Sequence, residues 1–127
     1  MHLQLENLHK SYLDGEGRNL HILRGVELRL EQPGQTAAIV GASGTGKSTL
    51  LHLIGLLDQP DQGRVLLDDK DLSLLSRDAQ ARYRNTQLGF IFQFHQLLQD
   101  FSALENVMMP ALVQGQSHSQ SRKSASE

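Results

Sequence analysis

The feature that most constrains this chain is a glycine-rich stretch of nine residues, Gly41-Ala42-Ser43-Gly44-Thr45-Gly46-Lys47-Ser48-Thr49. It fits the pattern of a phosphate-binding loop, G-x-x-x-x-G-K-[ST]. Glycines allow successive backbone N–H groups to turn inward around an anion. A helix that starts at the end of such a loop adds the positive end of its dipole at the same place. The stretch therefore predicts a site for nucleotide phosphates.

The residues on either side of the loop support this interpretation. The apolar segment 35–40 is typical of a buried strand that runs into the loop, and residues 47–57 have the pattern of a helix that leaves it. In that setting Lys47 would reach the β- and γ-phosphates, and the Ser48 hydroxyl would bind Mg²⁺. The alternative is a glycine-rich turn without a ligand, and the Lys-Ser-Thr ending disfavours it.

Other segments predict an α/β fold that begins with a β-rich part. Alternating apolar residues indicate strands over 3–12 and 21–30, and apolar runs indicate strands over 64–67 and 88–92. Ser76 is a suitable N-cap for a polar helix that extends to about residue 84. Ser102 and Glu105 match a capping box ahead of a second helix that contains Pro110. From residue 114 the chain is almost entirely polar, which predicts a disordered tail.

Composition narrows the range of functions. A length of 127 residues suits one domain, and the formal net charge of −2 gives no electrostatic reason to expect nucleic acid as a partner. The chain has no cysteine, so a disulfide framework and a thiolate metal site are both excluded. The first residues lack a signal-peptide pattern, and no apolar run is long enough to cross a bilayer. Any role at a membrane is therefore expected to depend on a partner.

A family resemblance rests on two features: the order in which the motifs follow one another, and the run from Leu88 to Pro110 after the phosphate loop. Its residues are LGFIFQFHQLLQDFSALENVMMP. The chain resembles the ATP-binding subunits of ABC transporters. Within them it is most similar to the subunit that energises the release of lipoproteins from the bacterial inner membrane, with macrolide-export and cell-division relatives next. The resemblance implies a partial P-loop NTPase core of the ABC ATPase type, with an antiparallel β subdomain at its N-terminus.

The resemblance also implies roles for particular residues. Tyr12 would stack on adenine, and Gln93 would contact Mg²⁺ and the attacking water. The phosphate-loop residues that would bind the cofactors ATP and Mg²⁺ are Gly41, Ser43, Gly44, Thr45, Gly46, Lys47, Ser48 and Thr49. The expected partners are membrane-spanning permease subunits and a second ATPase subunit. The expected location is peripheral, on the cytoplasmic side of the inner membrane.

The family pattern continues with a Leu-Ser-Gly-Gly-Gln signature, a strand ending in Asp-Glu and a switch histidine, and this sequence contains none of them. We therefore expect residues 1–93 to form a partial nucleotide-binding core, 94–113 a hinge loop and the start of a helical subdomain, and 114–127 a polar, disordered tail that is unrelated or degenerate. The chain alone is expected to bind ATP and not to hydrolyse it. Two alternatives are a truncated fragment without function and a small P-loop kinase or GTPase, although the guanine-recognition motif of a GTPase is not present.

Several residues admit a structural and a functional interpretation. Val65-Leu66-Leu67-Asp68 could be the metal-binding strand of a P-loop enzyme, but a peripheral strand and turn are favoured. The carboxylates between 58 and 71 do not fit a calcium loop and indicate a solvated surface. Tyr12 alone would be a core residue, and only the resemblance favours adenine stacking. For His95, loop packing and contact with a partner both remain open.

Overall fold

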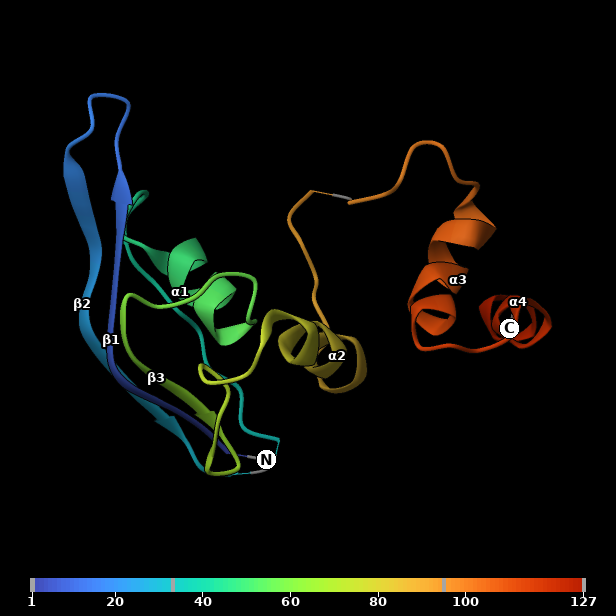
Figure 1. The fold of residues 1–127 in the computed structure, drawn as a ribbon, viewed down its shortest axis with the longest axis horizontal. Helices are drawn as coiled ribbons and strands as arrows, with labels where there is room; N and C mark the ends of the chain where they lie inside the picture. Colours follow the sequence, from blue (N-terminus) through green and yellow to red (C-terminus); the bar gives the residue numbers. More distant parts are fainter. Residues whose placement is uncertain (1, 33, 95, 127) are drawn as a thin grey trace. The chain divides into compact units, whose positions relative to one another are not determined.

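The computed structural model describes residues 2–32, 34–94 and 96–126. The chain divides into two compact units, Met1–Gln80 and Ala81–Glu127 (Figure 1). The first unit holds the sheet and the phosphate loop, and the second is helical. The division expected at residue 93, between the nucleotide-binding core and the hinge loop, stays a prediction.

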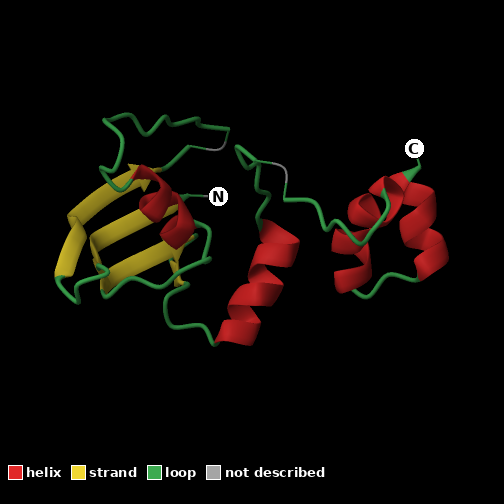
Figure 2. Cartoon of the chain, turned by 90° about the horizontal axis from the view of Figure 1, so that it is seen from above, coloured by secondary structure: helices red, strands yellow, loops and turns green. Residues whose placement is uncertain are grey.

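The first unit is built on an antiparallel sheet (Figure 2). Its four strands follow the order β2-β1-β3-β4. The strands are β1 (Leu3–Leu13), β2 (Asn19–Leu30), β3 (Gln62–Leu67) and β4 (Lys70–Asp71). A tight turn joins β1 to β2, in which the Asp14 N–H donates to the Arg18 carbonyl at 2.9 Å. This sheet confirms the antiparallel β subdomain expected at the N-terminus.

Helix α1 (Lys47–Ile54) packs on one face of this sheet (Figure 1). The core between them consists of Leu5, Leu8, Leu23, Leu50, Leu53 and Val65. The helix ends earlier than residue 57, because the chain closes it with a left-handed residue, Leu56, at φ 56°. The Leu57 N–H bonds to the His52 carbonyl at 2.8 Å and the Leu56 N–H to the Leu53 carbonyl at 3.1 Å, which is a Schellman motif.

The burial of Leu53 predicts a large effect on stability. Its side chain is fully buried, so Leu53→Ala should lower the free energy of unfolding by about 2–5 kcal/mol through lost burial and the cavity it leaves. Leu51 on the same helix is 55% exposed, and Leu51→Ala should cost less than about 1 kcal/mol. Urea denaturation followed by circular dichroism tests this, and equal costs for the two variants would contradict it.

The predictions of two strands, over residues 35–40 and 88–92, are wrong. Residues 35–40, ahead of the phosphate loop, and 88–92 contain no strand, and most of their side chains are exposed. A strand exists only when a neighbouring strand accepts and donates its backbone hydrogen bonds. Within the described ranges neither segment has such a neighbour, although its apolar residues suit a sheet interior.

The favoured interpretation of residues 65–68 is confirmed. Val65, Leu66 and Leu67 lie in β3, which pairs with β1 on one side and β4 on the other. Asp68 follows in the turn between β3 and β4, and its carboxylate accepts from the His2 N–H at 2.7 Å. Asp68 is thus a turn residue, outside the pocket described below.

The helices that follow are α2 (Arg77–Gln87), α3 (Ala103–Val113) and α4 (His118–Ala125). The expected capping box is present at the start of α3, where Ser102 and Glu105 satisfy each other's N–H groups. Helix α4 lies in the segment for which composition predicts disorder, and a second capping box, Ser117 with Gln120, starts it. Capping satisfies local N–H groups, so a mostly polar segment can still form a short helix that packs on α3. Throughout the described ranges, no helix is long and apolar enough to cross a membrane.

Candidate functional site

A pocket of about 380 Å³ lies between the phosphate loop and the first two strands. Its lining residues are Tyr12, Ile22, Ser43, Gly44, Gly46, Lys47, Ser48 and Thr49. Six of these belong to the loop and the first turn of α1, Tyr12 comes from β1 and Ile22 from β2. The structure thus brings Tyr12, which lies 29 residues before Gly41 in the sequence, to the same pocket as the loop.

The backbone of the loop has the conformation that anion binding needs. Gly41, Gly44 and Gly46 all have positive φ angles, of 156°, 79° and 91°. Gly46 is the N-cap of α1, and no side chain caps the N–H groups of the first turn. These donors, together with the positive end of the helix dipole, are therefore available to an anion in the pocket.

The Lys47 ammonium lies within the loop itself. Its Nζ donates to the Ala42 carbonyl oxygen at 2.6 Å, and the Thr45 hydroxyl donates to the same oxygen at 2.8 Å. These two bonds hold the loop closed on its own backbone. An ammonium has three donors, so Lys47 keeps two for phosphate oxygens.

For a metal ion, the pocket offers a hydroxyl. Ser48 lies at the first turn of α1 and lines the pocket. Among the residues that the structure describes, no group of three or more His, Cys, Asp or Glu side chains could hold a metal. Mg²⁺ is commonly bound through substrate phosphates and water with few protein ligands, and a single hydroxyl such as that of Ser48 is one such ligand.

The Tyr12 ring is 40% exposed in the pocket, and its hydroxyl is anchored. The hydroxyl donates to Asp58 Oδ2 at 2.7 Å. Burial raises the pKa of the Tyr12 hydroxyl, and the hydrogen bond to the Asp58 carboxylate and its negative charge raise it further. The ring is therefore neutral at physiological pH and suited to stacking.

Asp58 and Lys10 are the residues of this site that sequence reasoning missed. The Lys10 side chain is almost completely buried, and its Nζ lies 2.9 Å from Asp58 Oδ1. Burial, the largest single influence, raises the pKa of this carboxyl, but hydrogen bonds from Tyr12, Lys10 and the Gln59 N–H outweigh it and lower the pKa. The Asp58 side chain is 33% exposed, so it is partly solvated as expected, but it is also paired with Lys10 and Tyr12, which was not expected. Lys10, which lies two residues before Tyr12 in the sequence, was a possible signal. The sequence does not show, however, that Asp58 is the partner of this lysine.

Gln93 belongs to the second unit, where it lies exposed in a bend between α2 and α3. Its expected contacts with Mg²⁺ and water stay predictions. His95 lies outside the described residues, so both of its interpretations remain open.

Comparison with known proteins identifies the family. A model of the ABC transporter family matches residues 23–127. The chain belongs to the ABC transporter family. The matched range includes residues 114–127.

Two of the most similar curated relatives are ATP-binding proteins of lipoprotein-releasing systems. The chain is 52% identical over 118 residues to the lipoprotein-releasing system ATP-binding protein LolD of Shewanella frigidimarina, in a match that covers 93% of this chain and 48% of that protein. It is 47% identical to LolD of Hahella chejuensis, in a match that covers 97% of this chain and 52% of that protein. The chain thus spans about half the length of the curated relatives it matches.

Solved structures confirm the fold class. The ATP-binding cassette MJ0796, in a dimeric post-hydrolysis state bound to ADP and Pi, matches with a TM-score of 0.86 at 36% identity. The match covers 97% of this chain and 53% of the cassette. A second dimeric structure of MJ0796 matches with a TM-score of 0.84. The fold is that of an ABC ATPase cassette, of which this chain spans about half.

Proposed function

We propose that the chain binds MgATP in the pocket between the phosphate loop and Tyr12. The observation that carries this proposal is the joint lining of one pocket by Tyr12, Lys47 and Ser48. Uncapped N–H groups and the Lys47 ammonium match the triphosphate, the Ser48 hydroxyl matches Mg²⁺, and the Tyr12 ring matches the base. The cassette MJ0796, whose structure holds ADP and Pi, has the same fold.

The whole protein would be the ATP-binding subunit of a bacterial ABC transporter that energises the release of lipoproteins. The names of the two LolD relatives favour lipoprotein release over macrolide export or a role in cell division. Its partners would be membrane-spanning permease subunits and a second ATPase subunit, as the dimeric MJ0796 structures suggest. It would act as a peripheral protein on the cytoplasmic side of the inner membrane.

In this proposal the family reaction is phosphoryl transfer from ATP to water, which depends mainly on positioning and electrostatic stabilisation. Mg²⁺, when bound, would supply charge neutralisation at the phosphate oxygens. The residues of this chain would hold the phosphates at the N-terminus of α1 and keep the Lys47 ammonium against them. Gln93 would orient the metal and the attacking water in the complete domain.

The proposed function predicts a large loss of affinity in Lys47→Ala. Charge-assisted hydrogen bonds contribute about 1.5–3 kcal/mol, so the dissociation constant for MgATP should rise roughly 10- to 150-fold. Isothermal titration calorimetry measures this directly. Lys70→Ala on β4 is the matched control, because Lys70 does not line the pocket, and it should leave affinity unchanged. Equal affinity of Lys47→Ala and the unchanged chain would contradict the proposal.

A further inference from the structure

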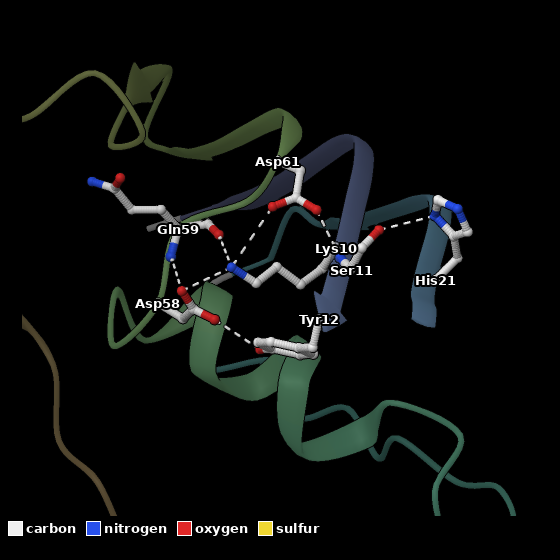
Figure 3. A network of polar contacts seen from close by, with 7 residues as sticks. All are labelled: Lys10, Ser11, Tyr12, His21, Asp58, Gln59 and Asp61. Carbon is white, nitrogen blue, oxygen red and sulfur yellow. Dashed lines mark hydrogen bonds and ion pairs between the residues drawn. The ribbon is translucent and has the colours of Figure 1, made fainter. Parts of the chain in front are cut away.

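A polar network holds the Tyr12 ring from two directions (Figure 3). It joins β1 to the segment between α1 and β3, which is about 48 residues away in the sequence. Its members are Lys10, Ser11, Tyr12, His21, Asp58, Gln59 and Asp61. Of these seven residues only Tyr12 lines the pocket, so the other six are not placed to contact a ligand there directly.

Asp58 is the centre of this network. One carboxylate oxygen accepts from the Tyr12 hydroxyl at 2.7 Å, and the other lies 2.9 Å from the Lys10 ammonium. The two oxygens therefore tie the end of the tyrosine ring to a buried cation. The Asp58 carboxylate also accepts from the Gln59 N–H at 2.7 Å, so the backbone of the next residue helps to fix its orientation.

Lys10 acts on the ring directly as well. Its ammonium lies over the Tyr12 ring, 5.1 Å from the ring centroid. This distance is within the range of a cation–π interaction. A cation over the ring restricts its rotation. Tyr12 still lines the pocket and is partly exposed, so part of the ring surface is accessible to a base.

The ammonium is itself held in place by the segment after α1. It donates to the Gln59 carbonyl at 2.7 Å and lies 3.8 Å from Asp61 Oδ1. The other Asp61 oxygen accepts from the Ser11 N–H at 2.7 Å. Lys10 is thus satisfied on the side away from the ring, and its position depends on side chains that do not line the pocket.

From this arrangement we propose that Lys10 and Asp58 are positioning residues, which hold the Tyr12 ring in the orientation that receives the base of the nucleotide. The inference rests on the proposed binding of ATP in this pocket. Pre-ordering the ring lowers the entropy lost on binding, so the network increases affinity for the base and not for the phosphates. A purely structural network would instead affect all ligands of the pocket alike.

The test compares two ligands in the presence of Mg²⁺: ATP, which carries the base, and inorganic triphosphate, which lacks it. Titration calorimetry on the 127-residue chain is applied to Lys10→Met, Asp58→Asn and Tyr12→Phe. A stacked aromatic contact contributes about 0.5–1.5 kcal/mol, so losing the orientation of the ring should weaken ATP binding by up to roughly two- to tenfold in each variant. Triphosphate binding should change by less than about twofold.

A matched control is Arg64→Met, which removes a different cation from an ion pair on the same sheet, with Glu6 of β1. It should leave both ligands unchanged. The double variant Asp58→Asn with Tyr12→Phe should bind ATP no more weakly than the weaker of the two single variants, because Asp58 acts through the tyrosine hydroxyl. Tyr12→Phe keeps both the ring and the Lys10–Asp58 pair, so it also tests the proposal if the charge variants unfold.

The outcomes separate the inference from the function it rests on. Unchanged ATP affinity in Lys10→Met, Asp58→Asn and Tyr12→Phe would overturn the positioning role. Equal weakening of ATP and triphosphate would also overturn it, since the network would then only support the fold of the loop. If the unchanged chain bound neither ligand, the proposed function would fail, and the positioning role with it.

Discussion

Gly63→Ala should destabilise the first unit strongly. Gly63 lies in β3 with a φ of +89°, which L side chains rarely adopt. A Cβ there would come within 2.6 Å of the Asn7 carbonyl carbon and would also collide with the carbonyl oxygens of Glu6 and Asn7. These atoms are backbone and cannot rotate away. The expected cost is about 3–5 kcal/mol, from backbone strain together with overpacking.

The collision has a specific origin in the sheet. The pairing of β1 with β3 shifts between Glu6 and His9, and Asn7 has a φ of +47°. This bulge in β1 pushes its carbonyl groups toward Gly63. A loss of about 3–5 kcal/mol is a large part of the ~5–15 kcal/mol that stabilises a typical domain. Most of the chain should therefore be unfolded at modest urea concentrations.

Gly17→Ala is the control that separates strain from collision. Gly17 has a similar φ of +77°, but nothing lies within 4 Å of the position that an added methyl group would take. It should cost only about 1–2 kcal/mol. Chemical denaturation of both variants, followed by circular dichroism, measures the difference. Equal midpoints would show that the close approach at Gly63 is not important for stability.

Gly46→Ala should abolish most nucleotide binding by moving the phosphate loop away from β2. Gly46 has a φ of +91°, and its Cβ would lie 2.8 Å from Ile22 Cγ2 and 3.0 Å from Leu23 Cδ2. Ile22 is β-branched, so its methyl group cannot turn away at low cost. Because Gly46 is also the N-cap of α1, the loop and the first helical turn must shift together. A shift that costs about 2 kcal/mol in binding raises the dissociation constant for MgATP roughly 30-fold.

Gly44→Ala is the matched comparison within the same loop. Its φ is +79°, and nothing lies within 4 Å of the added methyl group. If strain of about 1 kcal/mol is the whole effect, MgATP binding should weaken roughly fivefold. Calorimetric titration of both variants gives the ratio. Equal or greater weakening by Gly44→Ala would contradict the importance of the contact between Gly46 and Ile22.

The phosphate loop was predictable from sequence because its geometry is local. The glycine conformations, the start of α1 and the position of Lys47 depend on residues within about ten positions of one another. The same holds for the capping box of Ser102 and Glu105, which joins groups three residues apart. The alternation that predicted β1 and β2 is likewise a property of each strand and the turn between them.

Strand pairing, burial and ion pairs between residues that are distant in sequence could be learned only from the tertiary structure. The apolar runs at 35–40 and 88–92 predicted two strands, and this was wrong, because a strand requires a paired neighbour and neither segment has one among the described residues. The composition of 114–127 predicted a disordered tail, whereas the capping box of Ser117 and Gln120 starts α4 there. Asp58 was interpreted as a solvated carboxylate, and its pairing with Lys10 and Tyr12 across 48 and 46 residues was not expected. Pairing, burial and charge compensation of this kind depend on which surfaces the fold brings together, and no local pattern of residues specifies them.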